Sequence, residues 1–258
     1  MAIIENRDFI VVGQQPWDTP IGSNCKDLAL EFSKHNRVLY VNAPLDRRTK
    51  FQQSHTEGVK KRMRVINGQE EGLEQIGPNF WVYYPDVINE SINWMKPTAL
   101  FRIFNKINNK RFAKSVKKAI KQLNFKDFIL FNDSDMFRSY HLKELLNPST
   151  SIYYSRDNLL ATPYWGKHGK HLEPELIKKS NLCVANSVYL ANYCKQYNPN
   201  SFYVASLFGE VNQIQIENKV HFLYPYQLEV VFDNEDFKVE VRQSYFKTFC
   251  NIARLTPV

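Results

Sequence analysis

Two short acidic segments in the sequence have the residue types that move protons. Asp133 and Asp135 follow the apolar run at residues 127–131, and Asp157 follows another apolar run with Arg156 beside it. A carboxylate at the end of a buried strand can accept the proton of an incoming hydroxyl. It can equally cap the next helix or pair with a neighbouring base on the surface. Asp133 and Asp157 are therefore our candidate catalytic residues, with capping and surface pairing as the alternatives.

Other residues have side chains or positions suited to binding a sugar or a phosphate. Gly22, Ser23 and Asn24 precede a helical pattern, and the free N–H groups at the start of a helix bind phosphate or hydroxyl oxygens. Trp165 could stack on a sugar ring, and Arg156 directly follows a predicted strand, at the crevice where ligands of such sheets bind. The alternatives are an ordinary helix cap at Ser23 or Asn24 and simple packing of the tryptophan.

Several common catalytic motifs are missing. The sequence contains no Gly-x-Gly-x-x-Gly, no Gly-Lys-Ser/Thr and no Gly-x-Ser-x-Gly, which disfavours dinucleotide oxidoreductases, P-loop enzymes and serine hydrolases. His168 and His171 lie three residues apart, but no other histidine or cysteine has matching metal-ligand spacing, and we expect residues 163–174 to be irregular. We predict no metal site and no tightly bound cofactor.

The elements that would position these residues alternate between strand and helix. Short apolar runs predict strands, and most are followed by a polar turn and a helical pattern. The predicted strands are residues 7–13, 37–42, 80–84, 127–131, 151–154 and 182–185. Because these strands are apolar on both faces, they indicate a parallel sheet covered by helices on both sides. We predict a doubly wound α/β fold.

Ligands of doubly wound sheets bind outside the carboxyl ends of the strands. The fold would therefore gather the polar segments that follow the strands onto one rim. These segments are residues 13–24, 42–44, 84–86, 132–135, 155–158 and 186–187. We expect the functional residues on this rim.

The chain changes character near residue 204. Residues 1–204 carry the alternation of strands and helices, whereas residues 205–258 lose the helical punctuation and show strand-like alternation between residues 221 and 240. A complete second nucleotide-binding domain needs about 100 residues or more. We predict one domain over residues 1–204 and a short β-rich tail over residues 205–258.

The formal net charge of +8 is concentrated in one segment. Residues 98–126 hold nine bases and no acid, so the rest of the chain is nearly neutral. Apolar residues spaced by three or four, from Leu100 to Leu123, predict an amphipathic helix with a buried stripe and a cationic outer face. A second basic cluster, at residues 47–64, is predicted to be a loop or a mobile helix.

The cationic face of the predicted helix is suited to an anionic lipid surface, to which each base adds about 1 kcal/mol at most. The membrane-surface residues we predict are Arg102, Lys106, Lys110, Lys114, Lys117 and Lys121. A solvated face without a partner is the alternative. Because no zinc-finger or RNP-like motif accompanies the bases, we predict no nucleic-acid partner.

Several features of the sequence indicate the cellular compartment in which the protein works. The longest apolar runs are far shorter than the roughly 20 residues of a membrane span. The N-terminal residues lack the pattern of a secretory signal, and the four cysteines include no Cys-x-x-Cys pair, which fits a reducing environment. We expect a cytoplasmic protein that can reach the inner face of the membrane.

Several segments together resemble a known enzyme family. They are residues 8–18 (Asp-Phe-Ile-Val-Val-Gly-Gln-Gln-Pro-Trp-Asp) leading into Ile21-Gly22-Ser23-Asn24, residues 37–42 with Pro44, and residues 152–157 with 173–190. In order and spacing they resemble bacterial glycosyltransferases of the GT-B class, in particular the group-1-like enzymes of cell-surface polysaccharide synthesis. The resemblance covers roughly residues 7–204.

Enzymes of that family have two Rossmann-like domains that face a cleft, and they usually need no metal. The N-terminal domain binds the acceptor, and the C-terminal domain binds the nucleotide-sugar donor. The resemblance implies that residues 1–204 are an acceptor domain, with residues 13–24 lining the cleft. It also implies that basic surface features serve a lipid-linked acceptor. The donor-binding elements of the family are missing from residues 205–258.

We therefore expect a glycosyltransferase that moves a hexose from a nucleotide sugar to a lipid-linked or polysaccharide acceptor once a donor-binding half is supplied. If the reaction inverts the anomeric centre, Asp157 or Asp133 would act as the base at the acceptor hydroxyl. The main alternative is a non-catalytic module that binds a glycan or a membrane surface. A nucleotide-binding regulatory protein is a weaker alternative.

Overall fold

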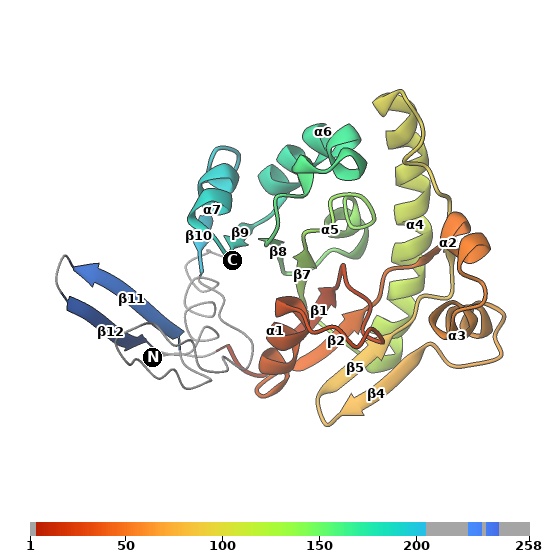
Figure 1. The fold of residues 1–258 in the computed structure, drawn as a ribbon. Helices are drawn as coiled ribbons and strands as arrows, with labels where there is room; N and C mark the ends of the chain where they lie inside the picture. The colour runs from red at the N-terminus through yellow and green to blue at the C-terminus, as the bar shows by residue number, and fades with distance from the viewer. Residues whose placement is uncertain (1–3, 205–226, 234–235, 243–258) are drawn as a thin grey trace.

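Eight strands form one mostly parallel sheet (Figure 1). The computed structural model describes residues 4–204 and the backbone of residues 227–233 and 236–242. The strands of this sheet are β1 (Asp8–Val12), β2 (Arg37–Val41), β4 (Leu73–Gly77), β5 (Phe80–Tyr83), β7 (Ile129–Asp133), β8 (Thr150–Ser155), β9 (Leu182–Ala185) and β10 (Ser201–Tyr203). Their order is β10-β9-β8-β7-β1-β2-β5-β4. The predicted α/β fold with a mostly parallel sheet is confirmed.

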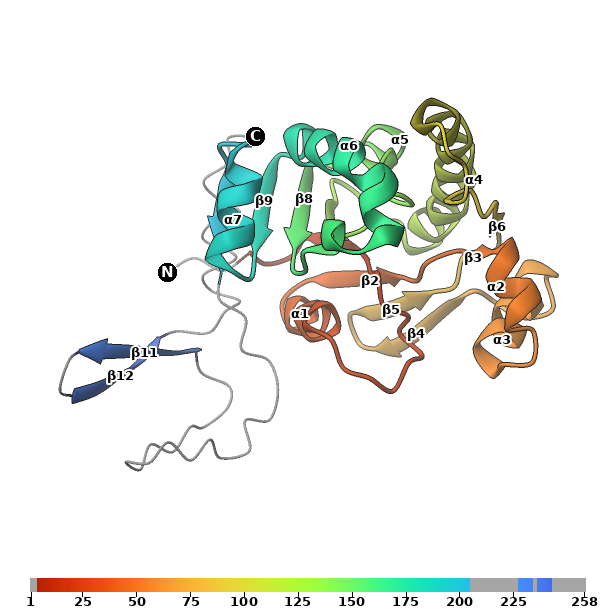
Figure 2. The same ribbon diagram turned by 45° about the horizontal axis from the view of Figure 1, so that its top comes forward.

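Helices cover both faces of the sheet (Figure 2). The helices are α1 (Asn24–Ser33), α2 (Arg47–Gln52), α3 (Glu57–Ile66), α4 (Thr98–Leu123), α5 (Leu142–Leu146), the 3-10 turn η1 (Leu159–Ala161), α6 (Pro163–Lys179) and α7 (Val188–Lys195). A two-stranded pair, β3 (Leu45–Asp46) with β6 (Ile88–Asn89), lies apart from the main sheet. The core on one face includes residues of α1 and α3, and the cores on the other include residues of α4, α5 and α6.

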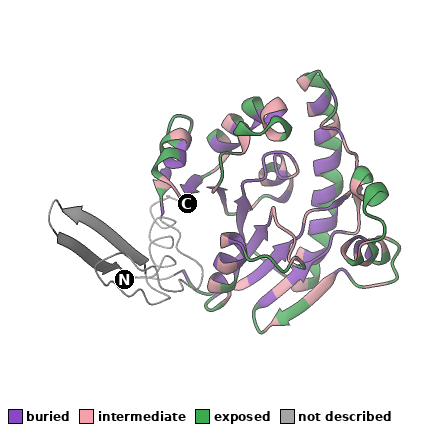
Figure 3. Ribbon diagram, in the orientation of Figure 1, coloured by how far each residue is buried: buried purple, intermediate pink, exposed green. Residues whose placement is uncertain are grey.

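Strand β1 shows why the sequence pattern identifies this architecture. All five of its residues are buried. Phe9 stacks on Phe32 of α1 with ring centroids 4.8 Å apart, whereas Ile10 belongs to the core on the opposite face with Phe112 of α4. Successive side chains of a strand point to opposite faces, so the strand is apolar from Phe9 to Val12, and Asp8 at its start is paired with Arg37. The purple interior of Figure 3 follows these strands.

The edge strand β4 was not predicted; it pairs antiparallel with β5 and has a register shift between Gln75 and Gly77. None of its five residues is buried. An exposed edge strand carries no apolar run, so the pattern that located the central strands is missing here.

The basic stretch at residues 47–64, predicted to be a loop or a mobile helix, forms two short helices. Asp46 caps α2 by accepting a hydrogen bond from Thr49 N at 3.0 Å, and Thr56 caps α3 by accepting one from Val59 N at 3.4 Å. Helix α3 buries Val59 and Val65, but α2 buries no residue. Capping groups therefore define both helices more than apolar spacing does.

The expectation of an irregular segment at residues 163–174 is wrong, because these residues belong to helix α6. Thr162 caps the helix, Pro163 occupies its first turn, and Leu172 and Leu176 are buried. Pro174 lies inside the helix, where it cannot donate a backbone hydrogen bond. Gly169 permits close packing, because a Cβ there would lie 2.4 Å from the Met136 sulfur. Tertiary packing overrides the helix-breaking residues.

Helix α4 is the predicted amphipathic helix, but its buried stripe is shorter than expected. Phe112 and Val116 are buried, whereas Leu100 and Ile107 are exposed. In the first half of the helix the buried positions are instead Phe101 and a set of asparagines. The exposed face keeps its cationic character along the whole helix.

Strand β7 extends two residues beyond its predicted end, so Asp133 lies within the strand and pairs in register with Tyr154 of β8. The helix expected after it is reduced to α5. The carboxylate of Asp135 accepts hydrogen bonds from the backbone N–H groups of Phe137 and Arg138, at 3.1 and 2.8 Å, and so stabilises a turn.

Strands β11 (Gln227–Asp233) and β12 (Asp236–Arg242) form an antiparallel hairpin within the segment predicted to alternate. The rest of the predicted tail at residues 205–258 lies outside the described residues.

Candidate functional site

The polar segments predicted to share one rim do so. Strands β1, β2, β5, β7, β8 and β9 are parallel neighbours, so their carboxyl ends meet at one edge of the sheet. The chain leaves β1 toward β2 on one side and returns to β7 on the other. The gap between β1 and β7 is therefore the topological switch point, where ligands of such sheets bind.

The switch point holds a closed cluster of charged groups. The Asp133 carboxylate is fully buried, and its Oδ1 lies 2.9 Å from Nε of Arg156, whose side chain is 17% exposed. Oδ2 of Asp133 accepts a hydrogen bond from Gln14 N at 3.3 Å. Burial raises the pKa of Asp133, although the charge of Arg156 opposes the rise. The structure thus brings together two of the predicted site residues, as an ion pair.

The turn after β1 packs tightly above this cluster. A Cβ on Gly13 would lie 2.0 Å from the Tyr40 hydroxyl, which donates a hydrogen bond to Gln15 O at 2.7 Å. Cys25 is fully buried nearby, and burial followed by the Asp133 charge raises the pKa of its thiol well above its usual range. Such a thiol is unreactive. The glycine at position 13 is therefore required by close packing.

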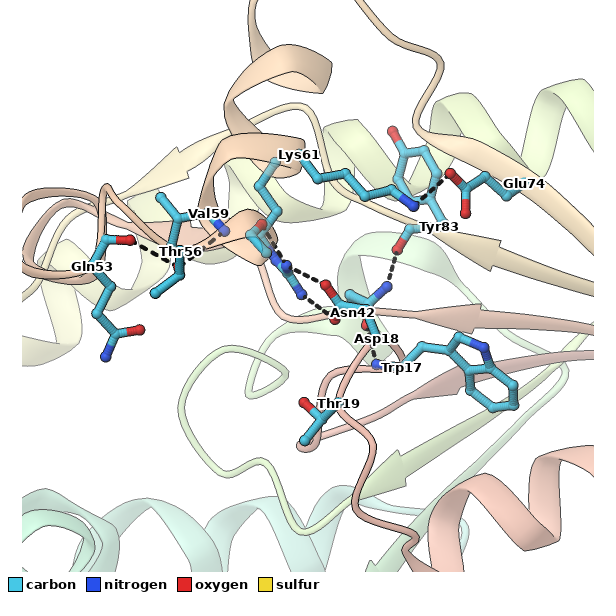
Figure 4. Close-up of polar contacts among 12 residues, drawn as sticks. Trp17, Asp18, Thr19, Asn42, Gln53, Thr56, Val59, Lys61, Glu74 and Tyr83 are labelled. Atoms are coloured by element: carbon cyan, nitrogen blue, oxygen red, sulfur yellow. Dashed lines mark hydrogen bonds and ion pairs between the residues drawn. The ribbon is translucent and has the colours of Figure 1, made fainter.

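The loop at residues 13–24 is held in place by contacts with Asn42, which follows β2, and with Arg62 of α3. Trp17 N donates to Oδ1 of Asn42 at 2.7 Å, and Nδ2 of Asn42 donates to Tyr83 O at 3.2 Å (Figure 4). Asp18 forms a two-bond ion pair with Arg62 of α3, at 2.9 and 3.0 Å. The loop therefore has a fixed path along the rim.

The predicted binding residues at the end of this loop start helix α1. Ser23 caps α1 by accepting a hydrogen bond from Lys26 N at 3.3 Å, and the Lys26 ammonium donates to two loop carbonyls, Thr19 O and Ile21 O. No atom lies within 4 Å of the place where a Gly22 Cβ would be. Asn24 follows as the first residue of the helix. The capping role of Ser23 is observed, and a ligand role for this segment stays a prediction.

Asp157 lies in a separate hollow, which we call the tyrosine hollow. It has a volume of about 300 Å³, and its lining includes Asp157, Glu173, Tyr189 and Tyr193. Glu173 is buried and accepts hydrogen bonds from the hydroxyls of Tyr153 and Tyr193, at 2.6 and 3.3 Å. The Asp157 side chain is 56% exposed and lies 3.6 Å from Arg156. Its carboxylate is therefore open to solvent, unlike that of Asp133.

A larger cavity on the rim, which we call the aromatic pocket, has a volume of about 320 Å³. The segments after β2, β5, β7 and β8 line it together with α4. Its aromatic lining residues are Trp94, Phe101, Phe137, Tyr164 and Trp165. Phe137 stacks on Trp165 at 4.9 Å. Of the predicted binding residues, Trp165 alone lies in this lining, and the aromatic side chains around it can cover the apolar face of a ligand.

Contacts with α6 fix the segment that carries Trp94. The Lys167 ammonium donates to Asn93 O and Trp94 O, at 3.0 and 2.9 Å, and Asn93 Nδ2 donates to Tyr164 O at 2.9 Å. His168 lies 3.0 Å from Met95 O through Nε2. The Trp94 side chain remains 74% exposed, so it is held at the pocket by its backbone.

Polar side chains complete the aromatic pocket. They are Asp46, Arg48, Thr49, Gln52, Asn89, Glu90, Ser91, Asn93, Asn105, Asn108 and Arg138. Glu90 is paired with Arg47 and Arg111. Burial alone would raise the pKa of Asp46, but hydrogen bonds from Ser91 and Thr49 outweigh it and lower the pKa. Asp46 is therefore an ionised carboxylate in the pocket lining.

Sequence analysis missed most of this pocket. The rim segment predicted after the strand at residues 80–84 ended at residue 86, whereas the pocket lining includes Asn89 to Trp94. A signal was present, since Ser91-Ile92-Asn93-Trp94 is a polar and aromatic segment after a predicted strand. Its meaning depends on partners from α4, where Asn108 contacts Glu90 18 residues earlier, and from α6, where Tyr164 contacts Asn93 71 residues earlier.

The predicted membrane-surface residues behave differently from one another. Arg102 forms a two-bond ion pair with Glu175 of α6, at 2.8 and 2.6 Å. The five lysines are exposed and make no ion pair with any described residue; they are Lys106, Lys110, Lys114, Lys117 and Lys121. Exposed Leu100, Ile103 and Ile107 lie among the first turns of the same helix.

The histidines considered as metal ligands have structural surroundings. His168 is fully buried and stacks on Phe101 at 4.1 Å. Within residues 4–204, no group of three or more histidine, cysteine or acidic side chains is placed to hold a metal ion. Nor does any helix of the described chain combine the length and apolar character that a membrane span needs.

Comparison with models of known protein families gives no match, and comparison with curated proteins gives none either.

Proposed function

We propose that this chain binds the acceptor in a glycosyl-transfer reaction, in which a hexose passes from a nucleotide sugar to a lipid-linked or polysaccharide acceptor. The observation that supports the proposal is the aromatic pocket at the carboxyl edge of the sheet. Aromatic side chains and neutral amides around one cavity suit a sugar ring, which has an apolar face and a polar edge. In this proposal the sheet is Rossmann-like and corresponds to the acceptor half of a GT-B enzyme.

Two carboxylates on the rim could serve as the base at the acceptor hydroxyl. Asp46 lies in the pocket lining and is ionised, and Asp157 has an exposed carboxylate in the tyrosine hollow. Asp133 is less accessible, because it is closed off by Arg156. Asp46 is the candidate base for an acceptor hydroxyl within the pocket, and we retain Asp157 as the predicted base for a hydroxyl that reaches the tyrosine hollow.

Sugar binding tests the proposal directly. We expect saturation-transfer NMR to detect binding of at least one of three methyl glycosides, those of α-D-glucose, α-D-mannose and α-D-galactose, to the full chain. No signal from any of the three at millimolar concentration would contradict the proposal. In a transfer assay with a nucleotide sugar and the donor-binding half, Asp157→Asn should reduce the rate by about a hundredfold or more if Asp157 is the base. A full rate in this variant would transfer the assignment to Asp46.

A second candidate function, attachment to an anionic membrane surface, is favoured by the exposed apolar residues of α4. Leu100, Ile103 and Ile107 are 42%, 60% and 40% exposed and lie among unpaired lysines. Aliphatic side chains can enter the headgroup region while neighbouring cations contact anionic lipids. We expect the protein to sediment with phosphatidylglycerol vesicles at low salt and to be released at high salt, because ions screen the attraction.

Two variants separate the contributions to this attachment. Replacing Lys110, Lys114 and Lys117 by glutamine should weaken vesicle binding strongly, at about 1 kcal/mol at most per lysine. The matched control replaces Lys34, Lys60 and Lys178 by glutamine, which changes the net charge equally at other exposed sites. An equal loss of vesicle binding in both variants would mean that the net charge of the protein, and not the face of α4, determines binding.

A further inference from the structure

Four asparagines line the aromatic pocket, and they differ in how their amides are used. Asn108 is fully engaged, because its Oδ1 accepts a hydrogen bond from Glu90 N and its Nδ2 donates to Glu90 O, both at 2.9 Å. Asn105 donates to Phe137 O at 3.0 Å. These two amides connect α4 to the segments that form the pocket wall. Their role in the fold accounts for their burial.

Asn89 is different. Its side chain is 4% exposed, and neither Oδ1 nor Nδ2 has a hydrogen-bond partner among the described residues. Oδ1 of Asn93, which also lines the pocket, is likewise without a partner there. A buried amide that makes no hydrogen bond destabilises the folded protein, and nearly all buried polar groups in proteins are paired. The wall of the pocket therefore retains unused hydrogen-bonding capacity beside the cavity.

The arrangement of an amide limits what could use this capacity. Oδ1 is an acceptor and Nδ2 is a donor, and the two atoms are side by side. Two hydroxyls on adjacent ring carbons match this pair, because one can donate to Oδ1 while the other accepts from Nδ2. An acetamido group does not match, since the N–H and C=O of its trans amide point in opposite directions. A neutral amide also gives no charge to hold an isolated anion.

We propose that Asn89 is a specificity-determining residue that binds two adjacent free hydroxyls of the sugar in the aromatic pocket. This inference rests on the proposed function, because it assigns the orientation of the acceptor that the pocket holds. The aromatic side chains cover one face of the ring, and Asn89 reads its edge. An acceptor that lacks either hydroxyl leaves one amide atom buried without a partner, which is the strongest basis for rejecting an analogue.

The test compares two isosteric variants in one pocket. In Asn89→Leu, the unpaired amide becomes apolar, so the thermal unfolding midpoint should stay the same or rise, while affinity for the best-bound methyl glycoside should fall about ten- to hundredfold. In the control, Asn108→Leu, two bonds to Glu90 are lost and the unfolding midpoint should fall. A merely structural role for Asn89 would make the two variants alike.

Deoxy analogues of the same glycoside locate the hydroxyl pair. Removal of either hydroxyl of the pair should weaken binding to the wild-type protein as much as Asn89→Leu does, and should cause no further loss in Asn89→Leu. A second variant, Asn89→Asp, retains two acceptor atoms for the hydroxyls and should bind better than Asn89→Leu. It also keeps the test informative if the leucine variant fails to fold.

The outcomes separate this inference from the proposed function. If the glycoside binds the wild-type protein and Asn89→Leu equally well, Asn89 does not read the sugar, and the acceptor proposal stands. If no glycoside binds the wild-type protein, the acceptor proposal fails and this inference fails with it. Lower stability of Asn89→Leu together with unchanged affinity would assign the amide to the fold.

Discussion

The centre of the rim and the aromatic pocket beside it are built in opposite ways. At the switch point, Asp133 and Arg156 form an ion pair around a fully buried carboxylate. In the aromatic pocket, aromatic, amide and charged side chains surround a cavity, and the amide of Asn89 has no hydrogen-bond partner among the described residues. The contrast teaches that a charged residue at a strand end is weak evidence for a ligand site. Unused hydrogen-bonding capacity beside a cavity is stronger evidence.

The largest expected effect would test whether Asp133 serves the fold. Asp133→Ala leaves the Arg156 charge without its partner, so the free energy of unfolding should fall by about 3 kcal/mol. Urea unfolding followed by circular dichroism measures this change. The matched control, Asp157→Ala, removes a carboxylate that is 56% exposed and should change the stability by about 0.5 kcal/mol or less. Unchanged stability with loss of glycoside binding in Asp133→Ala would instead assign Asp133 to the ligand.

A smaller effect should mark the aromatic pocket. Trp94→Ala removes a side chain that is 74% exposed and lines the pocket, so glycoside affinity should fall about tenfold with little change in stability. Phe51→Ala is the control, because Phe51 is 88% exposed on neighbouring α2 but does not line the pocket. Isothermal titration or NMR titration distinguishes the two. Equal losses of glycoside affinity would mean that exposed aromatic residues contribute to binding whether or not they line the pocket.

Helix α6 carries one ion-paired glutamate, Glu175, and one buried glutamate, Glu173. The two predict opposite effects of pH on the stability of the protein. Hydrogen bonds from Arg102, with a further contribution from Tyr140, lower the pKa of Glu175 to about 2 despite its partial burial. A lowered pKa in the folded state stabilises the protein above the unfolded value near 4.5, and this contribution is lost as the pH falls toward 2. Because the Glu175 side chain is 46% exposed, solvent screening limits the contribution to about 1 kcal/mol. Glu175→Gln should flatten the acid limb of the stability curve.

Glu173, two residues earlier, should show the opposite slope. Burial raises its pKa, although hydrogen bonds from Tyr153 and Tyr193 oppose the rise. A carboxyl that keeps its proton longer in the folded state loses stability as the pH rises from the unfolded value near 4.5 through the raised pKa. Urea midpoints between pH 4.5 and 8 should therefore decline in the wild-type protein and decline less in Glu173→Gln. A steeper decline in the variant would contradict the assignment.

Local patterns were sufficient for the central elements of the fold. The run at residues 182–185 is a strand with the predicted bounds, and β1 lies within the predicted run at residues 7–13, because burial on both faces favours a continuous apolar run. The pattern failed for β4, which is exposed, and for α6, whose glycines and proline oppose helix formation locally. Both errors occur where burial or packing against distant elements, rather than local preference, determines the structure.

The candidate site was predicted less well than the fold. The rim was located correctly, and Trp165 lies in the aromatic pocket. The structure places the two predicted bases in different surroundings. Arg156 encloses Asp133, and Asp157 lies in the tyrosine hollow. Asn89 was not predicted, because it is one of 24 asparagines in the sequence, and their partners are unknown until the chain folds.

The layered architecture and the shared edge of the strand ends follow from the amino-acid pattern, since alternation of apolar strands and helices has few physical solutions. The pattern also determines the cationic face of α4, which depends only on helical spacing. Which polar groups find hydrogen-bond partners depends on how the chain packs. Asn108 and Asn89 have the same side chain and line the same cavity, yet the backbone of Glu90 engages one and no described residue engages the other. That difference arises from contacts between segments far apart in the chain, which local sequence cannot specify.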